Sequence, residues 1–209
     1  MLESLAVTVK FIFRQRKQGR IESFDQLADF LGSRSAYIAQ TSLYGYLKTR
    51  MGTQFTRYFE DDEFSRLIHQ AALRLYVSCL ADFTIHCVAL LKERASLSSD
   101  DARELANGLF EAALAKGVTE RDRVLLPSDA IVEFGQRVSK TVWESELNAS
   151  HAFQRSVEDV LRFAPVVEEF KVLDTEIVTN SIRFRWRDAR EQLRNRLSVE
   201  EVVASSFRS

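Results

Sequence analysis

Three side chains able to bind a metal ion or a small ligand lie close together in an otherwise apolar stretch. They are Cys79, Asp82 and His86. On an α-helix this spacing places all three on one face, where they could meet a ligand together. The alternative is packing, in which Asp82 and His86 make polar contacts with a neighbouring helix and Cys79 is a small apolar side chain. We favour packing, because a metal site needs further donors and the sequence has no ExxH, HExxH or CxxC spacing.

The sequence also lacks the common patterns of nucleophilic and phosphate-binding enzymes. It contains no GxSxG, and its 7 glycines are isolated, so they form no glycine-rich phosphate loop. We therefore expect a protein without catalytic activity and without a cofactor or metal. The alternative from the residues is a hydrolase or metal enzyme that would use Cys79, Asp82 and His86.

The stretch that carries these three residues predicts a buried helix at the centre of the fold. From about residue 61 to residue 95, apolar side chains cover most of the circumference of a helix, which requires burial on nearly every side. Asp82 would then need a basic partner, which we expect on the last long helix. Only a narrow strip should face solvent, comprising Arg66, Gln70, Arg74, Ala81 and Lys92.

Composition predicts an all-α protein, a multi-helix bundle around this central helix. The hydrophobic fraction of 45% is enough for a core, whereas only 7 Gly and 2 Pro are available for turns. Residues 1–209 are expected to form a single all-helical domain. A subdivision into an N-terminal part, residues 1–55, and a helical core, residues 56–209, is the alternative.

Charge and cysteine content indicate a cytoplasmic protein. The formal net charge of -1 gives no general attraction to nucleic acid or anionic membrane. The two cysteines are about 12 Å apart along one predicted helix, which is too far for a disulfide. The N-terminal sequence does not show the pattern of a secretory signal, and residues 75–91 are slightly short for a bilayer, so we expect no membrane span.

Capping residues and glycines predict two helices in the first part of the chain. Ser23 and Gln26 have the spacing of a capping box, and the helix that they begin should stop at Gly32. The next helix is expected over residues 35–51, with Ala and Leu side chains facing inward.

Proline and serine positions predict three helices in the second half. Ser128 should begin a helix that continues to about residue 147. Pro165 should kink or interrupt a helix over residues 150–173, because proline removes a backbone donor. The last long helix is expected over residues 175–197.

The last long helix is basic and carries an apolar stripe that includes Trp186. It could bind nucleic acid, a membrane surface or an acidic partner. The alternative is a solvated face balanced by acidic neighbours such as Glu168 and Glu169, which we favour because the net charge is near zero. The basic surface comprises Arg183, Arg185, Arg187, Arg190 and Arg194.

The first part of the sequence resembles the helix-turn-helix of TetR-type regulators. The resemblance covers about the first 55 residues and rests on SFDQLADFLG and SLYGYLKTR, with Ala28 at the helix crossing and Gly32 at the turn. It implies a DNA-binding dimer with a small-molecule pocket in the later helices. The DNA-facing residues that it implies are Arg34, Gln40, Thr41, Tyr44 and Lys48.

A second resemblance concerns the segment TSLYGYLKTRMGTQFTRYFEDD, which is similar to one in uncharacterised bacterial all-helical proteins. The residues favour a non-enzymatic helical interaction or regulatory protein that acts by macromolecular binding or self-association. A protein partner or a homo-oligomer is therefore expected. The alternative is a divergent TetR-like transcriptional regulator, which would bind nucleic acid and a small-molecule effector.

Overall fold

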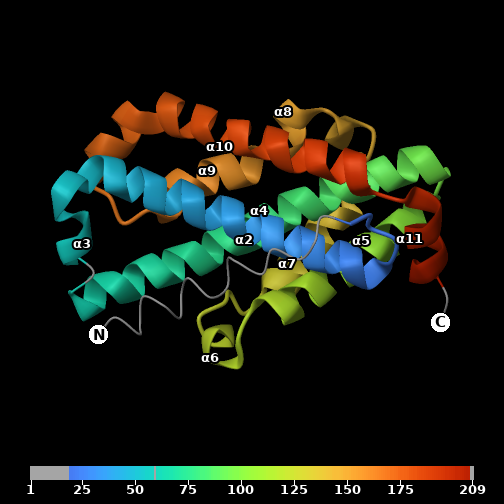
Figure 1. Cartoon of the computed structure of the whole chain (residues 1–209), viewed down its shortest axis with the longest axis horizontal. Helices are drawn as coiled ribbons and strands as arrows, with labels where there is room; N and C mark the ends of the chain where they lie inside the picture. Colours follow the sequence, from blue (N-terminus) through green and yellow to red (C-terminus); the bar gives the residue numbers. More distant parts are fainter. Residues whose placement is uncertain (1–18, 59, 208–209) are drawn as a thin grey trace.

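The computed structural model describes residues 19–58 and 60–207, whose regular segments are helical (Figure 1). The all-α prediction is confirmed. The long helices are α2 (Phe24–Met51), α4 (Asp62–Ala95), α5 (Ser99–Gly117) and α10 (Glu168–Arg196). The shorter helices are α7 (Ala130–Ser139), α9 (Gln154–Phe163) and α11 (Val199–Ser206). Single turns are α3 (Phe55–Tyr58), α6 (Glu120–Arg123), α8 (Ala149–Ala152) and the 3-10 turns Gly52–Gln54 and Ser145–Leu147.

α4 is the central helix, as predicted. The Asp61 side chain accepts the backbone N–H groups of Glu63 and Phe64 at its start, and Ser96 ends it in the left-handed conformation. Residues 78–91 are all buried, because α2, α5 and α9 pack around this half of the helix. Figure 1 shows α10 along α2 and α9 at the upper edge, with α7 on the lower side.

The solvent strip of α4 is less continuous than the sequence predicts. Arg66 and Arg74 are exposed and Gln70 and Lys92 are half-buried, but Ala81 is buried, so the strip is interrupted in the middle of the helix. Among the described helices, α4 is the one long and apolar enough to cross a membrane. However, 89% of its most apolar window is buried inside the protein, as in the core helix of a bundle.

α2 is one continuous helix, so the predicted turn at Gly32 is wrong. Ser23 does cap its start, and its hydroxyl oxygen accepts the N–H of Gln26 at 3.3 Å. At Gly32 an added Cβ would lie 3.5 Å from the Ala113 carbonyl oxygen and 3.5 Å from the Tyr76 hydroxyl. These are ordinary van der Waals distances, so the contact does not require glycine. Buried residues on both sides of Gly32 pack against α4 and α5, and this packing overrides the local signal for a helix end.

Two helix boundaries in the second half also differ from the prediction. α7 ends at Ser139 rather than near residue 147. The predicted interruption at Pro165 is confirmed, because α9 ends at Phe163 and proline holds Ala164 in an extended conformation. α10 then begins at Glu168, well before residue 175.

The core is organised around the Phe83 ring of α4. Its centroid lies 5.8 Å from that of Phe30 on α2, 5.3 Å from that of Trp186 on α10 and 6.4 Å from that of Phe153, just before α9. These rings belong to one continuous hydrophobic core. α2 and α10 are therefore fixed to the same central helix.

A backbone clasp joins the segment before α2 to the end of α10. The Ile21 N–H donates to the Arg196 carbonyl at 2.8 Å, and the Ser198 N–H donates to the Ile21 carbonyl at 2.9 Å. The Arg196 side chain also donates to the Gly19 carbonyl at 2.8 Å. Ile21 is buried beneath these bonds, so the clasp is part of the core.

Gly117→Ala should destabilise the fold. An added Cβ would lie 2.2 Å from the Tyr76 hydroxyl oxygen and 3.0 Å from its ring. Tyr76 is buried, and its hydroxyl donates to the Ala113 carbonyl at 3.2 Å, so the ring cannot move without losing this bond. We expect the free energy of unfolding, measured by urea titration, to fall by about 1–3 kcal/mol.

Gly45→Ala is the matched control. Its added Cβ would meet only Arg185 Nη2, at 3.8 Å, on the exposed side of α2. Alanine favours a helix over glycine by about 0.5–1 kcal/mol, so this variant should be at least as stable as the wild type. Equal losses at both positions would contradict the role of Tyr76.

Candidate functional site

The buried carboxylate of Asp82 lies where four helices meet. Its Oδ1 is 2.7 Å from Nη1 of Arg137 on α7, and its Oδ2 accepts the Ser156 N–H of α9 at 2.8 Å. The Ser156 hydroxyl oxygen accepts the Nε1–H of Trp186 on α10 at 3.0 Å. Burial raises the pKa of Asp82, and Arg137 and the Ser156 N–H oppose this by favouring the charged form.

Asp82 supplies a cap that α9 does not have in its own sequence. Phe153 precedes α9, and no side chain at that position caps the helix. The Asp82 carboxylate therefore pairs with a first-turn N–H and lies at the positive end of the helix dipole. Its basic partner is Arg137 on α7, so the expectation of a partner on the last helix is wrong.

His86 is buried and neutral. Its Nδ1 lies 2.7 Å from the Glu146 carbonyl oxygen, and because a carbonyl only accepts, Nδ1 carries the proton. Burial lowers the pKa of His86 to about 4, and the charges of Arg190 and Arg194 also lower it. Its Nε2 is buried without a hydrogen-bond partner among the described residues. Asp82 and His86 thus contact different elements.

Cys79 packs as a protonated thiol. Burial raises its pKa well above the ordinary value, and the carboxylates of Asp82 and Asp159 raise it further. A protonated thiol is a poor nucleophile and a poor metal ligand. Within residues 19–58 and 60–207, no group of three or more His, Cys, Asp or Glu side chains is arranged to hold a metal ion.

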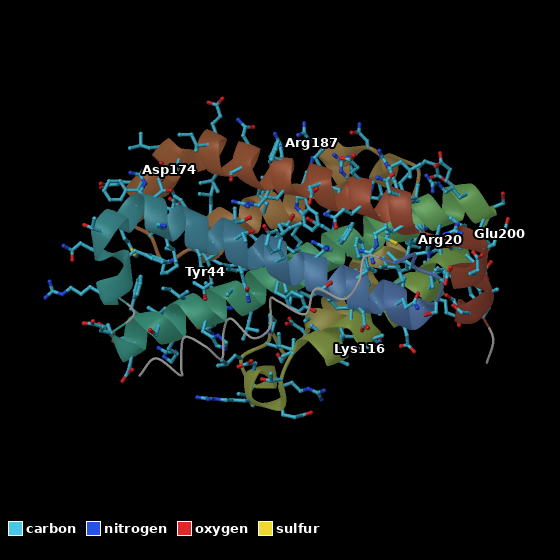
Figure 2. All side chains as sticks on the ribbon, in the orientation of Figure 1. Arg20, Tyr44, Lys116, Asp174, Arg187 and Glu200 are labelled. Carbon is cyan, nitrogen blue, oxygen red and sulfur yellow. The ribbon has the colours of Figure 1, made fainter. Side chains whose placement is uncertain are left out.

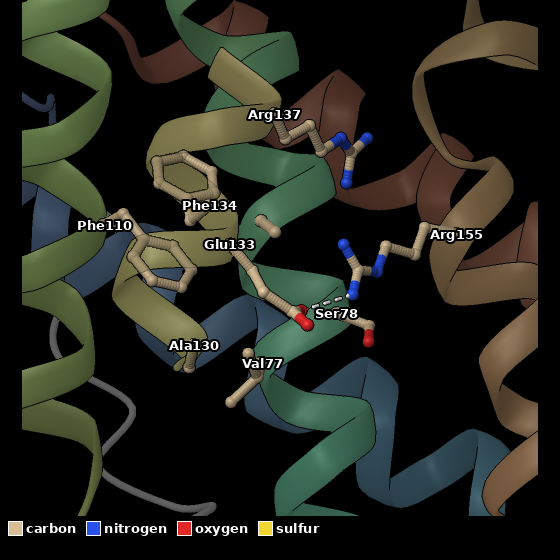
Figure 3. Close-up of a pocket in the computed structure, with 9 residues that line it drawn as sticks. Val77, Ser78, Phe110, Ala130, Glu133, Phe134, Arg137 and Arg155 are labelled. Carbon is tan, nitrogen blue, oxygen red and sulfur yellow. Dashed lines mark hydrogen bonds and ion pairs between the residues drawn. The ribbon is translucent and has the colours of Figure 1, made fainter. Parts of the chain in front are cut away.

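A pocket close to these residues has room for about one water molecule. It has a volume of about 20 Å³ and lies between α4, α7 and α9. Arg155 of α9 and Glu133 of α7 pair beside it, with Nη2 and Oε2 2.9 Å apart (Figure 3). None of Cys79, Asp82 and His86 lines this pocket.

The residues that the TetR resemblance assigns to DNA do not share one exposed surface. Lys48 is exposed, whereas Arg34 and Tyr44 are half-buried. The Thr41 hydroxyl donates to a carbonyl of its own helix at 2.7 Å, and the side-chain oxygen of Gln40 is buried. No family model, curated protein or solved structure matches the chain, so the resemblance stays a prediction.

The predicted basic surface of α10 is not balanced by the expected acidic neighbours. Glu168 and Glu169 lie in the first turn of α10, roughly 20 Å from the nearest of these arginines, so this expectation is wrong. None of the five arginines lies within ion-pair distance of an acidic side chain in the described part of the chain. Arg183, Arg187 and Arg194 are exposed, and Arg185 and Arg190 are half-buried.

α10 also carries an apolar line on its outer side. Phe170, Leu173, Ile177 and Phe184 are 46%, 74%, 73% and 63% exposed. Because they follow at intervals of three, four and seven residues, they lie along one side of the helix, and we call them the outer stripe. Figure 2 shows α10 at the upper edge of the molecule, with side chains such as Arg187 pointing away from it.

The sequence pattern does not predict the outer stripe, for a reason that lies in the helix boundary. A helix that begins at residue 175 contains only Ile177 and Phe184, which are too few to define a line. The apolar side chains that do form a clear pattern lie on the opposite, buried side of α10. These are Val178, Ile182, Trp186, Ala189 and Leu193.

Arg137→Met should leave the Asp82 carboxylate buried without its counter-ion. The Arg137 side chain is 24% exposed and that of Asp82 is 0% exposed. Removing one partner of a buried pair lowers stability by about 3–5 kcal/mol, and we expect the lower end here. Adding Asp82→Asn, which removes the charge, should recover part of this loss in urea titrations.

Arg123→Met is the control for this change. It breaks only an exposed pair with Glu120, with the charged atoms 3.3 Å apart, and should lower stability by less than about 1 kcal/mol. The assignment fails if the double variant Arg137→Met/Asp82→Asn is no more stable than Arg137→Met alone.

His86 should make the fold less stable in mild acid. Its pKa is about 4 in the folded protein and about 6.5 when unfolded, so the unfolded state binds the proton first. The stability that it contributes is complete above about pH 6.5 and is lost as the pH falls towards 4. Between pH 8 and pH 5 this group should lower the free energy of unfolding by about 2 kcal/mol.

His86→Asn keeps a donor for the Glu146 carbonyl but does not titrate. It should be less stable than the wild type at pH 8 and should lose less stability between pH 8 and pH 5. Burial raises the pKa values of Asp82 and Glu146, which acts in the opposite direction in both proteins. Parallel curves of stability against pH for the two proteins would contradict the assignment.

Proposed function

We propose that this protein is a non-catalytic helical interaction protein that binds another polypeptide through the outer stripe of α10. The observation that supports this most directly is the exposure of four large apolar side chains along one side of one helix. Single exposed apolar residues are ordinary on a protein surface. A line with the spacing of helix–helix contacts is typical of a surface that another helix covers.

α10 presents this stripe on a preformed surface. On its inner side, the Trp186 ring packs against Phe83, with centroids 5.3 Å apart. At its N-terminal end, Asp174 forms an ion pair with Arg50 of α2, whose guanidinium also lies 4.8 Å from the centre of the Phe170 ring. A surface that is already ordered loses little conformational entropy on binding.

Charged side chains beside the stripe favour a polypeptide over nucleic acid as the partner. Glu169 and Glu176 are exposed on the first half of α10, and Arg183 and Arg187 are exposed on the second half. An apolar centre with a charged rim is the usual composition of a protein interface. Nucleic acid would bring its phosphates towards both glutamates, which would weaken binding.

The polar residues of the core support a non-catalytic protein. Asp82 is used to cap α9 and to pair with Arg137, and His86 is neutral beside a backbone carbonyl. Cys79 is a buried thiol with a raised pKa. Each group thus has a structural explanation that needs no substrate.

Ile177→Cys tests whether the stripe is covered. The native Cys79 and Cys87 are buried, so a maleimide reagent should modify only the introduced thiol of the folded protein. In intact cells that produce the protein, we expect this variant to be labelled much more slowly than Glu111→Cys, at an exposed position of α5. Mass spectrometry would measure both rates.

Equal labelling of Ile177→Cys and Glu111→Cys, in cells and in concentrated purified protein, would contradict the proposal. Duplex DNA binding that weakens steeply with salt and is lost in Lys48→Ala would instead favour the TetR-like alternative. A gel shift at low and at physiological salt measures this second outcome.

A further inference from the structure

The two halves of α10 carry opposite charge. Residues 168–180 contain four carboxylates and one lysine, a net charge of -3, whereas residues 181–196 contain six arginines and two carboxylates, a net charge of +4. Glu169, Glu176 and Arg183 are exposed and follow at intervals of seven residues, so they line the same flank of the outer stripe. None of these three forms an ion pair within the described part of the chain.

From this pattern we propose that the partner of the outer stripe is a second copy of the chain, bound with its α10 antiparallel. The inference rests on the proposed function of the stripe and names its occupant. A second copy carries both halves of the charge pattern, so each acidic half meets a basic half once the helix direction is reversed. The interface is then two-fold symmetric, as in most homodimers.

The register of this dimer follows from the stripe and its flank. A two-fold axis beside Ile177 and Asn180 places Leu173 of one copy opposite Phe184 of the other. The same register places Glu176 opposite Arg183 of the second copy, and symmetry repeats each contact. Apolar layers therefore lie at the centre and charge pairs lie along the edge, the arrangement that sets orientation in coiled coils.

A parallel dimer of α10 would not pair opposite charges. It would bring the acidic halves together and the basic halves together, and like charges at such contacts are unfavourable. It would also place Glu169 near Asp174 of the other copy. The charge sequence along α10 thus selects the antiparallel arrangement.

The test uses the full chain and two single charge reversals. Light scattering of the purified protein should give twice the 24.0 kDa protomer mass at high concentration. Glu176→Arg and Arg183→Glu should each weaken the dimer about tenfold, because each reversal creates two like-charge contacts. An equimolar mixture of the two variants should form a heterodimer of wild-type affinity, in which both pairs have opposite charges again.

Controls separate assembly from folding. Ile177→Asp should abolish the dimer without lowering the free energy of unfolding of the monomer, because its side chain is exposed. Reversals at exposed sites on other helices, Glu111→Arg and Arg66→Glu, should leave the dimer unchanged.

Two outcomes would overturn the inference. A dimer whose reversed variants do not rescue each other has another geometry. A monomer at every concentration has no self-complementary α10. If Ile177→Cys is then labelled slowly in cells but fast in the purified protein, a different protein covers the stripe and the proposed function survives. Slow labelling of the purified monomer would mean that the chain covers its own stripe, and fast labelling in cells that nothing covers it; either result would exclude both proposals.

Discussion

The arrangement of the bundle depends on one buried carboxylate. Asp82 is fully buried in the middle of α4, where its charge requires partners, and it finds them on α7 and α9. Through the Ser156 hydroxyl the same contact reaches Trp186 on α10. A requirement for electrostatic compensation at one point therefore fixes three helices against the fourth, including the helix that presents the outer stripe.

The sequence predicts those helices whose own pattern of apolar residues shows which sides are buried. α4 is apolar on nearly every side, so its length, its capping residues and its central place can be inferred directly. Gly32 is different, because an isolated glycine after a short amphipathic segment has the same local pattern at a helix end and at a close helix crossing. Only the packing of α2 against α4 and α5 on both sides of Gly32 decides between the two, and that packing is tertiary.

Part of the candidate site can likewise be predicted from the sequence, and part cannot. The conflict between burial and residue type at Asp82 and His86 is visible in the sequence, because both lie in an apolar helix. The sequence does not reveal which residue pairs with Asp82. Its partner Arg137 lies on a short helix with a solvent-exposed side, and no local pattern connects that helix to Asp82. The outer stripe can be recognised only when the start of α10 is known. A helix that begins at Glu168 instead of residue 175 adds Phe170 and Leu173 to Ile177 and Phe184, and the four side chains form a line.

The clasp between Ile21 and the end of α10 has a consequence for the way the chain is made. Two backbone hydrogen bonds join positions separated by about 175 residues, so the bundle can close only after Ser198 has left the ribosome. Until then the buried faces of α2 and α4 have neither α10 nor the clasp to cover them. The nascent chain therefore exposes, until that point, the apolar side chains that α10 covers in the folded protein, among them Phe83.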